Sequence, residues 1–480
     1  MVTTVLHISD LHRDSGSAIT TDSLLESLRR DRERYTADGI PAPDLAVVSG
    51  DIVYGVNSNS PEADALLKKQ YVEAATFLTG LADMFFHGDR DRVILVPGNH
   101  DISHPHVIRA TESTAIPTDA TQRALLASQL SEDNSTWRWV ASDFALRRLV
   151  DQDMYGRRLE PYAEFYTDFY ASKRSFSLDP SKQFAVHDLA HLGLVVVGLS
   201  SCCDNDLFNR AGRIHPDCVA GATRAVAGHV KDGRVALAVW HHNLAGGPKD
   251  ADYVDADVLQ SLIDGGFVVG LHGHQHRPQF LEHRFTADRK MAISVISAGT
   301  LCGGPKTLPS GRMRSYNLIV LDAEQRTGTV HVREMKNSGF GLPVWGAAYV
   351  NEFSGPSMSF ELKISLRPGS VMQAIAAAAE LLQKGDHAGA YGLASLHPED
   401  GIARRVAVEA LTRLEDWAGL QTFCSPPRSS PEFIALAGAL YETGKKLDLA
   451  KLLESDFARN SADAGVRQAV ELARSRLGGR

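Results

Sequence analysis

The chain is poor in cysteine and has no long apolar run. Five of its 480 residues are cysteines, Cys202, Cys203, Cys218, Cys302 and Cys424, and they lack the paired spacing of a zinc site. Few, unpaired cysteines argue against a disulfide-stabilised secreted protein and indicate reduced thiols. No apolar run reaches the ~18 residues that a membrane span needs, and the first residues read as a strand rather than a signal peptide. We therefore expect a cytoplasmic protein without a membrane segment.

A strong excess of charge is also absent. Lys and Arg number 50 and Asp and Glu 58, which gives a net charge of -8. A mildly acidic chain has no overall field that attracts nucleic acid, so binding of nucleic acid would require a local basic patch. The apolar content of 44% is ordinary for a globular protein. The length predicts two or three domains.

What the sequence does contain is five short polar motifs, each placed where an apolar run ends. The runs, residues 5–8, 45–48, 93–96, 235–239 and 267–269, read as buried strands. The motifs that follow them are Asp10-Leu11-His12, Gly50-Asp51, Gly98-Asn99-His100-Asp101, His241-His242 and Gly273-His274-Gln275-His276. Ligands of open α/β sheets bind at the carboxyl ends of strands, so these motifs predict one polar rim at the edge of a sheet.

Residues 1–345 alternate short apolar strands with amphipathic helices, which is typical of a layered α/β domain. Further strands are expected at 183–187, 192–199, 292–296, 316–321 and 329–332. We predict two sheets packed face to face between helices, a four-layer α-β-β-α sandwich. Between 102 and 182 the pattern changes, and apolar residues of 120–149 follow helical spacing, which predicts a helical insertion that overhangs the polar rim.

The insertion also carries a group of aromatic residues. They are Tyr155, Tyr162, Phe165, Tyr166, Phe169 and Tyr170. Two interpretations are open: the rings pack the insertion onto the core, or they hold a nucleobase or another ring of a substrate.

The C-terminal part is predicted to be a separate helical domain. A Gly/Pro-rich stretch marks a boundary, so we assign 346–368 to a linker and 369–480 to helices rich in Ala, Leu and Glu. Asp386-His387-Ala388-Gly389 recurs 30 residues later as Asp416-Trp417-Ala418-Gly419. A period near 30 indicates an array of helical hairpins similar to tetratricopeptide-type repeats. These helices either bind a protein partner or pack onto the first domain.

The residue types of the five motifs favour divalent metal ions. Asp10 and His12 are one residue apart, so in an extended segment both side chains point the same way, and His274 and His276 repeat that spacing. Carboxylate, amide and imidazole groups are the donors that borderline divalent metals prefer. The two oxygens of Asp51 allow it to bridge two ions. Glycines at 50, 98 and 273 permit sharp turns that bring backbone close to the ions.

The order of the motifs over about residues 1–345 resembles the calcineurin-like metallophosphoesterase superfamily. The resemblance implies a β-sandwich with two metals, one held by Asp10, His12, Asp51 and His276 and the other by Asp51, Asn99, His241 and His274. It implies that both ions are divalent; we predict Mn²⁺, with Fe, Zn, Ni or Co as alternatives. It also implies that His100 is the catalytic histidine and that Asp101 orients it. Neighbouring side chains of a strand face opposite sides, so only one of the two histidines is expected to ligate a given metal. In this family the ligand is usually the first residue after the strand, so we choose His241 and expect His242 either behind the ligands or on the substrate side.

This resemblance predicts a hydrolase that cleaves phosphodiester bonds of a nucleotide or a related small diester. Metal-activated hydroxide would attack phosphorus while His100 protonates the leaving group. Arg13, His242 and Arg277 are candidate substrate contacts, and Arg213 is a further candidate to contact phosphate. Alternatives are a DNA or RNA nuclease of the repair type, a phosphomonoesterase, or a scaffold that acts through its C-terminal helices, and the protein could form oligomers. The segment Gly50-Asp51-Ile52-Val53-Tyr54-Gly55 lacks the Asp-Arg-Gly of Ser/Thr protein phosphatases, which disfavours that class.

Overall fold

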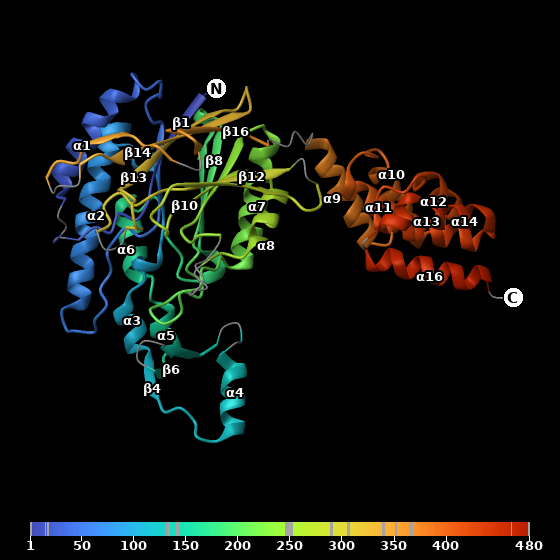
Figure 1. The fold of residues 1–480 in the computed structure, drawn as a ribbon, viewed down its shortest axis with the longest axis horizontal. Helices are drawn as coiled ribbons and strands as arrows, with labels where there is room; N and C mark the ends of the chain where they lie inside the picture. Colours follow the sequence, from blue (N-terminus) through green and yellow to red (C-terminus); the bar gives the residue numbers. More distant parts are fainter. Residues whose placement is uncertain are drawn as a thin grey trace. The chain divides into compact units, whose positions relative to one another are not determined.

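In the computed structural model the chain divides into two compact units, Met1–Ser365 and Leu366–Arg480 (Figure 1). The structure describes residues 2–14, 16, 19–130, 132, 135–140, 144–244, 253–288, 291–304, 308–337, 341–350, 353–363, 369–461 and 463–478. Within these residues, no helix is long and apolar enough to cross a membrane.

The first unit is built on two mixed sheets. The larger sheet has the order β15-β14-β13-β1-β2-β3, with β16 also paired to β14, and the smaller has the order β11-β12-β10-β9-β8-β7. The larger sheet comprises β1 (Val2–Ile8), β2 (Leu45–Ser49), β3 (Val93–Val96), β13 (Ser315–Asp322), β14 (Thr327–Met335), β15 (Trp345–Ala347) and β16 (Ser357–Glu361). The smaller comprises β7 (Phe184–Leu189), β8 (Leu194–Leu199), β9 (Val235–Val239), β10 (Phe267–His272), β11 (Gln279–Arg284) and β12 (Ala292–Ser297).

The alternation of side chains along the strands divides the apolar core into three layers. In β1, Val5 belongs to the cluster between the two sheets, whereas Leu6 and Ile8 face the helices on the other side. Val196 and Leu237 of the smaller sheet fill the same central cluster, as expected for strands whose successive side chains point to opposite faces. Helices cover both outer faces, so the predicted four-layer α-β-β-α sandwich is confirmed (Figure 1).

The covering helices are unequal on the two sides. The larger sheet is covered by α1 (Thr21–Tyr35), α2 (Ala63–Phe86) and α6 (Glu160–Phe169), and the smaller sheet by α7 (Pro216–Lys231) and α8 (Ala256–Asp264). Most of the predicted aromatic group lies on or beside α6, and Phe165 stacks on Tyr71 of α2 with ring centroids 5.1 Å apart. Tyr162, Phe165, Tyr166, Phe169 and Tyr170 are buried in this core. Of the two interpretations, the structure therefore shows packing.

The insertion is only partly helical. It contains α3 (His104–Arg109), α4 (Ala120–Leu130), α5 (Gln152–Gly156) and a third sheet of order β4-β6-β5, formed by β4 (Thr111–Thr114), β5 (Trp137–Val140) and β6 (Ala145–Leu149). The prediction of helix through 149 is therefore wrong beyond Leu130. In β5, Arg138 is buried and pairs with Asp206 at 2.8 Å, whereas Trp139 is 41% exposed. The buried residue of this alternating pattern is charged, so apolar spacing did not reveal the strand.

The predicted linker at 346–368 is also wrong in part. Residues 357–361 form β16, which pairs antiparallel with β14 from Ser357↔His331 to Glu361↔Thr327. These residues therefore belong to the larger sheet. Residues 364–368 of the predicted linker lie outside the described residues.

The second unit consists of helices in consecutive pairs. They are α9 (Gly369–Gln383), α10 (His387–Ala394), α11 (Gly401–Arg413), α12 (Trp417–Phe423), α13 (Ser430–Glu442), α14 (Lys446–Leu453), α15 (Asp456–Asn460) and α16 (Ala464–Gly478). Asp386 and Asp416 cap α10 and α12, accepting hydrogen bonds from the amides of Gly389 and Gly419 at 2.9 and 2.8 Å. A Cβ at either glycine would lie 2.4 Å from the capping carboxylate. The repeated Asp-x-x-Gly is thus an N-cap motif, while the similarity to tetratricopeptide repeats stays a prediction.

Candidate metal centre

The polar motifs meet where the two sheets present the carboxyl ends of their parallel strands. Asp10, Asp51 and Asn99 follow β1, β2 and β3, which are parallel neighbours in the larger sheet. His241 follows β9 and His274 follows β10, a parallel pair in the smaller sheet. The polar rim was predicted at the edge of one sheet, whereas in the structure residues from the edges of two facing sheets form it.

One group of donor atoms gathers around Asp10. The Nε2 atom of His276 lies 3.1 Å from Oδ1 of Asp10 and 3.2 Å from Nε2 of His12. Nε2 of His12 lies 3.9 Å from Oδ1 of Asp10 and also 3.9 Å from Oδ2 of Asp51. All four side chains are buried. This group contains the four residues that the resemblance assigns to the first metal.

A second group gathers around Asn99. Its Oδ1 atom lies 3.1 Å from Nε2 of His241 and 3.0 Å from Nδ1 of His274, and those two nitrogens are 3.3 Å apart. Oδ1 of Asp51 lies 3.3 Å from Nε2 of His241. Asp51 thus directs one carboxylate oxygen to each group, as a bridging ligand would.

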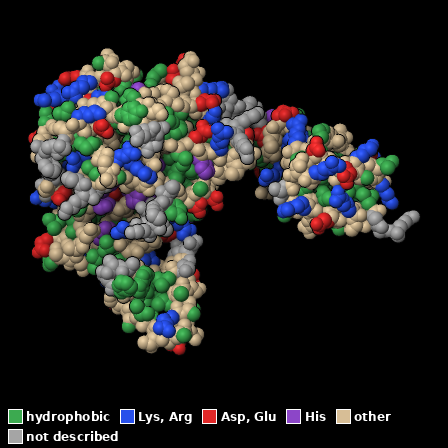
Figure 2. Space-filling view, viewed as in Figure 1, with side chains coloured by type: hydrophobic (Ala, Val, Ile, Leu, Met, Phe, Trp, Pro, Cys, Tyr) green, Lys and Arg blue, Asp and Glu red, His purple; other side chains and the backbone are tan. Residues whose placement is uncertain are grey.

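These distances fit two divalent ions. Donor atoms about 2.0–2.2 Å from a shared ion lie about 3.0–3.5 Å from one another, as most of these do. His241 donates from Nδ1 to the carbonyl oxygen of Ser49 at 2.8 Å, so Nε2 is the ring nitrogen directed at the second group, and it would ligate an ion on loss of its proton. Nδ1 of His12 is buried and has no hydrogen-bond partner among the described residues. In the space-filling view, histidine side chains are visible at several places on one face of the first unit (Figure 2).

The backbone at the site is strained. Asp10, His12, Asp51, His274 and His276 have φ values of 51°, 44°, 51°, 74° and 53°. The left-handed region is uncommon for residues other than glycine and costs of order 1–3 kcal/mol each. Five of the seven predicted ligands share this feature, which is typical of positions where function outweighs local stability.

Glycines make the close approach of the loops feasible. A Cβ at Gly98 would lie 2.2 Å from Oδ1 of Asp51, and one at Gly273 would lie 2.6 Å from Oδ2 of Asp10. Gly50 has a φ of +93°, and its Cβ would lie 2.5 Å from Nδ1 of His241. The three glycines therefore bring backbone against the donor groups, as the sequence indicated.

Burial and mutual charge perturb the titration of these groups. Burial lowers the pKa of His12 to about 4. Burial opposes protonation of His241 as well, but the Asp51 carboxylate overcomes it and raises the pKa of His241 to about 9. Although burial works in the opposite direction, the His241 and His100 rings hold the pKa of Asp51 well below its usual range. The carboxylates are thus ionised, as ligation requires.

His100 lies beside both groups, and its orientation comes from the backbone. Its Nδ1 donates to the carbonyl oxygen of Tyr54 at 2.6 Å, and its amide donates to Oδ1 of Asp51 at 2.9 Å. Its ring centroid is 4.7 Å from that of His12. Since Nδ1 carries the hydrogen bonded to Tyr54, Nε2 is the ring atom left to exchange a proton with a substrate.

Asp101 does not contact the His100 ring through the bonds described for it. Its carboxylate accepts hydrogen bonds from the amides of Gly98 at 2.8 Å and of Ile52 and Val53 at 3.2 and 3.3 Å. Burial and the nearby Asp51 raise the pKa of Asp101 to about 7. The expectation that Asp101 orients His100 is therefore corrected: the carboxylate joins the loops after β2 and β3.

Two of the predicted substrate contacts face elsewhere. Arg13 is fully buried and its guanidinium pairs with Glu73 of α2 at 2.7 Å, so it is not available to a substrate. His242 is buried, with Nδ1 2.8 Å from Oγ of Ser201 and Nε2 3.1 Å from Nδ2 of Asn205. Arg13 is therefore not placed to contact a substrate, and His242 lies behind the donor groups, which is one of the two places expected for it.

The other two arginines differ from each other. Arg213 forms an ion pair with Asp204 at 2.8 Å. Arg277 is half-buried, and its Nε has no hydrogen-bond partner among the described residues. Arg277 therefore remains a candidate contact.

Ser201 is a site residue that the sequence reasoning missed. Its Oγ accepts hydrogen bonds from the amides of His241 and His242 at 3.2 and 3.1 Å, which fixes the start of that motif. Ser200 and Ser201 follow the apolar strand β8. The rule that found the five motifs, a polar residue at the end of an apolar strand, would have found Ser201 too.

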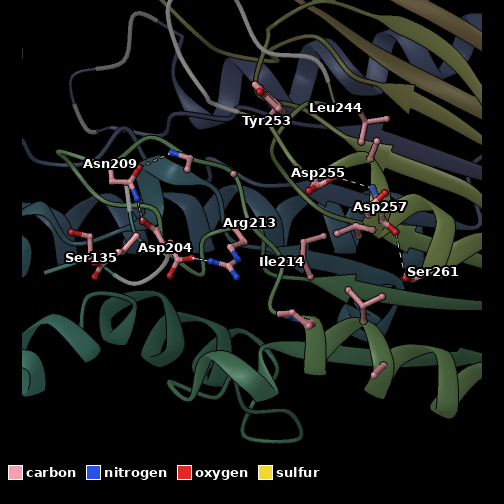
Figure 3. Close-up of a pocket in the computed structure, with 18 of the residues that line it drawn as sticks. Ser135, Asp204, Asn209, Arg213, Ile214, Leu244, Tyr253, Asp255, Asp257 and Ser261 are labelled. Carbon is pink, nitrogen blue, oxygen red and sulfur yellow. Dashed lines mark hydrogen bonds and ion pairs between the residues drawn. The ribbon is translucent and has the colours of Figure 1, made fainter. Parts of the chain in front are cut away.

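A groove of about 1310 Å³ lies between β5, the loop that follows β8 and the start of α8 (Figure 3). Arg213 and Asp204 pair on one side of it, and Asp255 and Asp257 lie on the other. Gly212 lines the groove and packs on His242, since a Cβ there would lie 2.6 Å from the Cβ of His242. The groove is thus separated from the donor groups by Gly212 and His242.

The chain is similar to several known proteins. The model of the calcineurin-like phosphoesterase family matches residues 3–278, more than half of the chain. No curated protein matches the sequence. Among solved structures, the chain is similar to a purple acid phosphatase from yellow lupin (Lupinus luteus) seeds, at 7% identity and a TM-score of 0.39, over 75% of this chain and 54% of that one. It is also similar to a dimetal phosphatase from Danio rerio, at 10% identity and a TM-score of 0.36, over 72% of this chain and 98% of that one.

The chain therefore spans about half the length of the lupin protein. The family match begins within β1 and extends past His276, so it includes every strand and motif from which the seven donor residues come. The family implies a dinuclear divalent metal centre and a metal-dependent phosphoester hydrolase. On this evidence the chain belongs to the calcineurin-like phosphoesterase family.

Proposed function

We propose that the protein is a dinuclear phosphodiesterase that cleaves nucleotides or related small diesters to a monoester and an alcohol. The observation that carries the proposal is the convergence of seven donor side chains from two sheets, with Asp51 between the two groups. A structural role alone does not explain five strained residues in one cluster.

Asp10, His12, Asp51 and His276 would hold one ion, and Asp51, Asn99, His241 and His274 the other. When bound, such ions neutralise charge on the phosphate and lower the pKa of the attacking water. Imidazole, carboxylate and amide donors suit Mn²⁺, and they also suit Fe, Zn, Ni or Co.

His100 would act as the general acid. Its Nδ1 hydrogen is held by the Tyr54 carbonyl oxygen, which fixes the orientation of the ring. A protonated Nε2 can then donate to the leaving oxygen as the bond to phosphorus breaks. The Tyr54 carbonyl thus supplies the orientation that the sequence assigned to Asp101.

Preference for a diester is supported by the arginines. A monoester carries up to two negative charges and a diester one, so a monoesterase gains more from free cations beside its metals. Arg13 and Arg213 are both paired with carboxylates, which leaves Arg277 as the proposed cationic contact among the three candidate arginines.

The test compares wild type with His100→Asn, after metal analysis, on bis-p-nitrophenyl phosphate, p-nitrophenyl phosphate, cyclic AMP and single-stranded DNA. We expect the small diesters to react fastest. His100→Asn should retain both metals and lose about 10²–10⁴-fold in turnover of cyclic AMP, whose leaving group needs a proton. The loss on p-nitrophenyl esters should be smaller, because that leaving group is stable as an anion.

His191→Asn, a change at an exposed histidine after β7, is the matched control and should behave as wild type. Absence of hydrolysis with every metal supplied would overturn the proposal in favour of a scaffold. Faster turnover of the monoester, or of DNA, would replace it by a phosphomonoesterase or a nuclease.

A further inference from the structure

Tyr54 is an exposed aromatic residue at the edge of the donor groups. Its side chain is 47% exposed, and its ring centroid lies 5.9 Å from that of His100 and 6.1 Å from that of His12. The ring is therefore open to solvent on one side and next to the proposed general acid on the other. An aromatic ring left this exposed contributes little to the core.

The backbone that carries Tyr54 is held on both sides. The amide of Tyr54 donates to the carbonyl oxygen of Arg13 at 3.2 Å, and its own carbonyl accepts from His100. The next residue, Gly55, donates its amide to Oε1 of Gln70 at 2.9 Å and accepts at its carbonyl from Nε2 of Gln70 at 3.3 Å. The ring thus projects from a fixed loop, which lowers the entropy cost of using it for binding.

The position of His100 decides which part of a substrate reaches this ring. With Nδ1 bonded to the Tyr54 carbonyl, the proton for the leaving group comes from Nε2. The leaving-group oxygen must then lie beside Nε2. The rest of the leaving group must pass the residues that lie next to His100 on its exposed side. Tyr54 is such a group.

We propose that Tyr54 is a specificity-determining residue that selects phosphoesters with a flat leaving group, by packing its ring on an aromatic or heterocyclic ring. This inference rests on the proposed function and deepens it, since it names the class of leaving group. Offset or edge-to-face ring contacts contribute roughly a tenfold preference when one is gained or lost.

The test measures binding and turnover separately on metal-loaded protein. Binding of phenylphosphonate and methylphosphonate is measured by calorimetry for wild type, Tyr54→Ala and Tyr54→Phe. Turnover is measured on a phosphodiester with a phenyl leaving group and on one with a hexafluoroisopropyl leaving group. Phenol and hexafluoroisopropanol are of similar acidity, so the two leaving groups need a proton to a similar extent. Tyr349→Ala is the control: Tyr349 is 68% exposed and follows β15, at the opposite edge of the larger sheet from β3.

We expect Tyr54→Ala to weaken phenylphosphonate binding and kcat/KM for the phenyl ester about tenfold, with little change for the methyl and alkyl compounds. Tyr54→Phe, which keeps the ring, should retain the preference, and Tyr349→Ala should change nothing. Equal losses on both classes, no loss, or a Tyr54→Phe variant as impaired as Tyr54→Ala would overturn the assignment.

The two proposals fail separately. Wild type that hydrolyses nothing but binds phenylphosphonate in a Tyr54-dependent way would overturn the proposed function and support only the packing of the Tyr54 ring on the ring of a bound ligand. Wild type that hydrolyses esters without a Tyr54-dependent preference would overturn only the specificity role, as would wild type that binds neither phosphonate.

Discussion

At the scale of single residues, His187 on β7 is the side chain whose protonation most clearly conflicts with folding. It is fully buried, and neither ring nitrogen has a hydrogen-bond partner among the described residues. Burial, together with the charge of Arg174, lowers its pKa from 6.5 to about 3. Tyr170 is the aromatic ring that faces it, 6.2 Å away between centroids.

The unfolded chain therefore binds this proton at higher pH than the folded chain. The contribution of neutral His187 to stability is complete above pH 6.5 and is lost as the pH falls from 6.5 towards 3. We expect His187→Leu to remove this loss, so that the variant gains on wild type by about 1.4 kcal/mol per pH unit in that window. Unfolding in urea, measured from pH 4 to 7 for both proteins, gives this difference, and a difference independent of pH would contradict it.

Residue type and position at a strand end were enough to predict the seven donor side chains, which the structure brings together. They were not enough for Arg13, His242 or Asp101. Arg13 is neutralised by Glu73, 60 positions along the chain, and Asp101 bonds to amides of the neighbouring loop. Such partners are set by tertiary packing, which spacing within a motif does not encode.

At the scale of elements, α11 and α13 of the second unit are joined by a buried ion pair. Arg404 donates from Nε and Nη2 to the two carboxylate oxygens of Glu432 at 2.7 and 2.8 Å, and both side chains are buried. Arg404 also donates to the carbonyl oxygen of Phe423 at 3.0 Å, which adds α12 to the contact.

Loss of one partner leaves the other charge buried and unpaired. We expect Arg404→Met to destabilise the helical unit by about 3–5 kcal/mol, and the double change Arg404→Met with Glu432→Leu to cost much less. Hydrogen exchange of α13 amides in wild type and both variants measures the effect. A double variant as unstable as the single one would show that packing, and not the unpaired charge, sets the cost.

Elements were predictable where apolar runs were long and uncharged. The strands that carry the motifs were located from such runs, and β3 has the predicted bounds. In contrast, the buried residue of β5 is an arginine and the buried residue of β16 is Phe360 alone, so neither strand shows a run of apolar residues. Residues in these two segments form strands because other strands pair with them, and the local sequence pattern does not show that pairing. The pattern alone therefore predicted helix for 120–149 and a linker for 346–368.

At the scale of the whole molecule, the donor groups connect two sheets that also pack on each other through a buried apolar cluster. Ions bound there would link β1, β2 and β3 to β9 and β10. Removal of metal would leave the strained ligand backbones without compensation.

We therefore expect chelation to lower the unfolding temperature of the first unit by several degrees, since a ligand at 100 times its Kd stabilises by about 2.7 kcal/mol. The transition of the helical unit, which contains none of the predicted ligands, should not move. Calorimetry with and without chelator resolves both. Equal shifts of the two transitions, or none, would contradict a metal link confined to the sandwich.

The division of the donor residues between two sheets also determines the stage of protein synthesis at which the metal centre can first form. Asp10, His12, Asp51 and Asn99 are synthesised early, whereas His241, His274 and His276 come after the insertion and three further strands, β7, β8 and β9. Neither half offers an ion the full set of donors. A nascent chain can therefore assemble the complete centre only after residue 276 has left the ribosome, when the strands that carry all seven donor residues are available to pack. The order of the motifs thus makes metal loading a late event of synthesis and ties it to the closure of the sandwich.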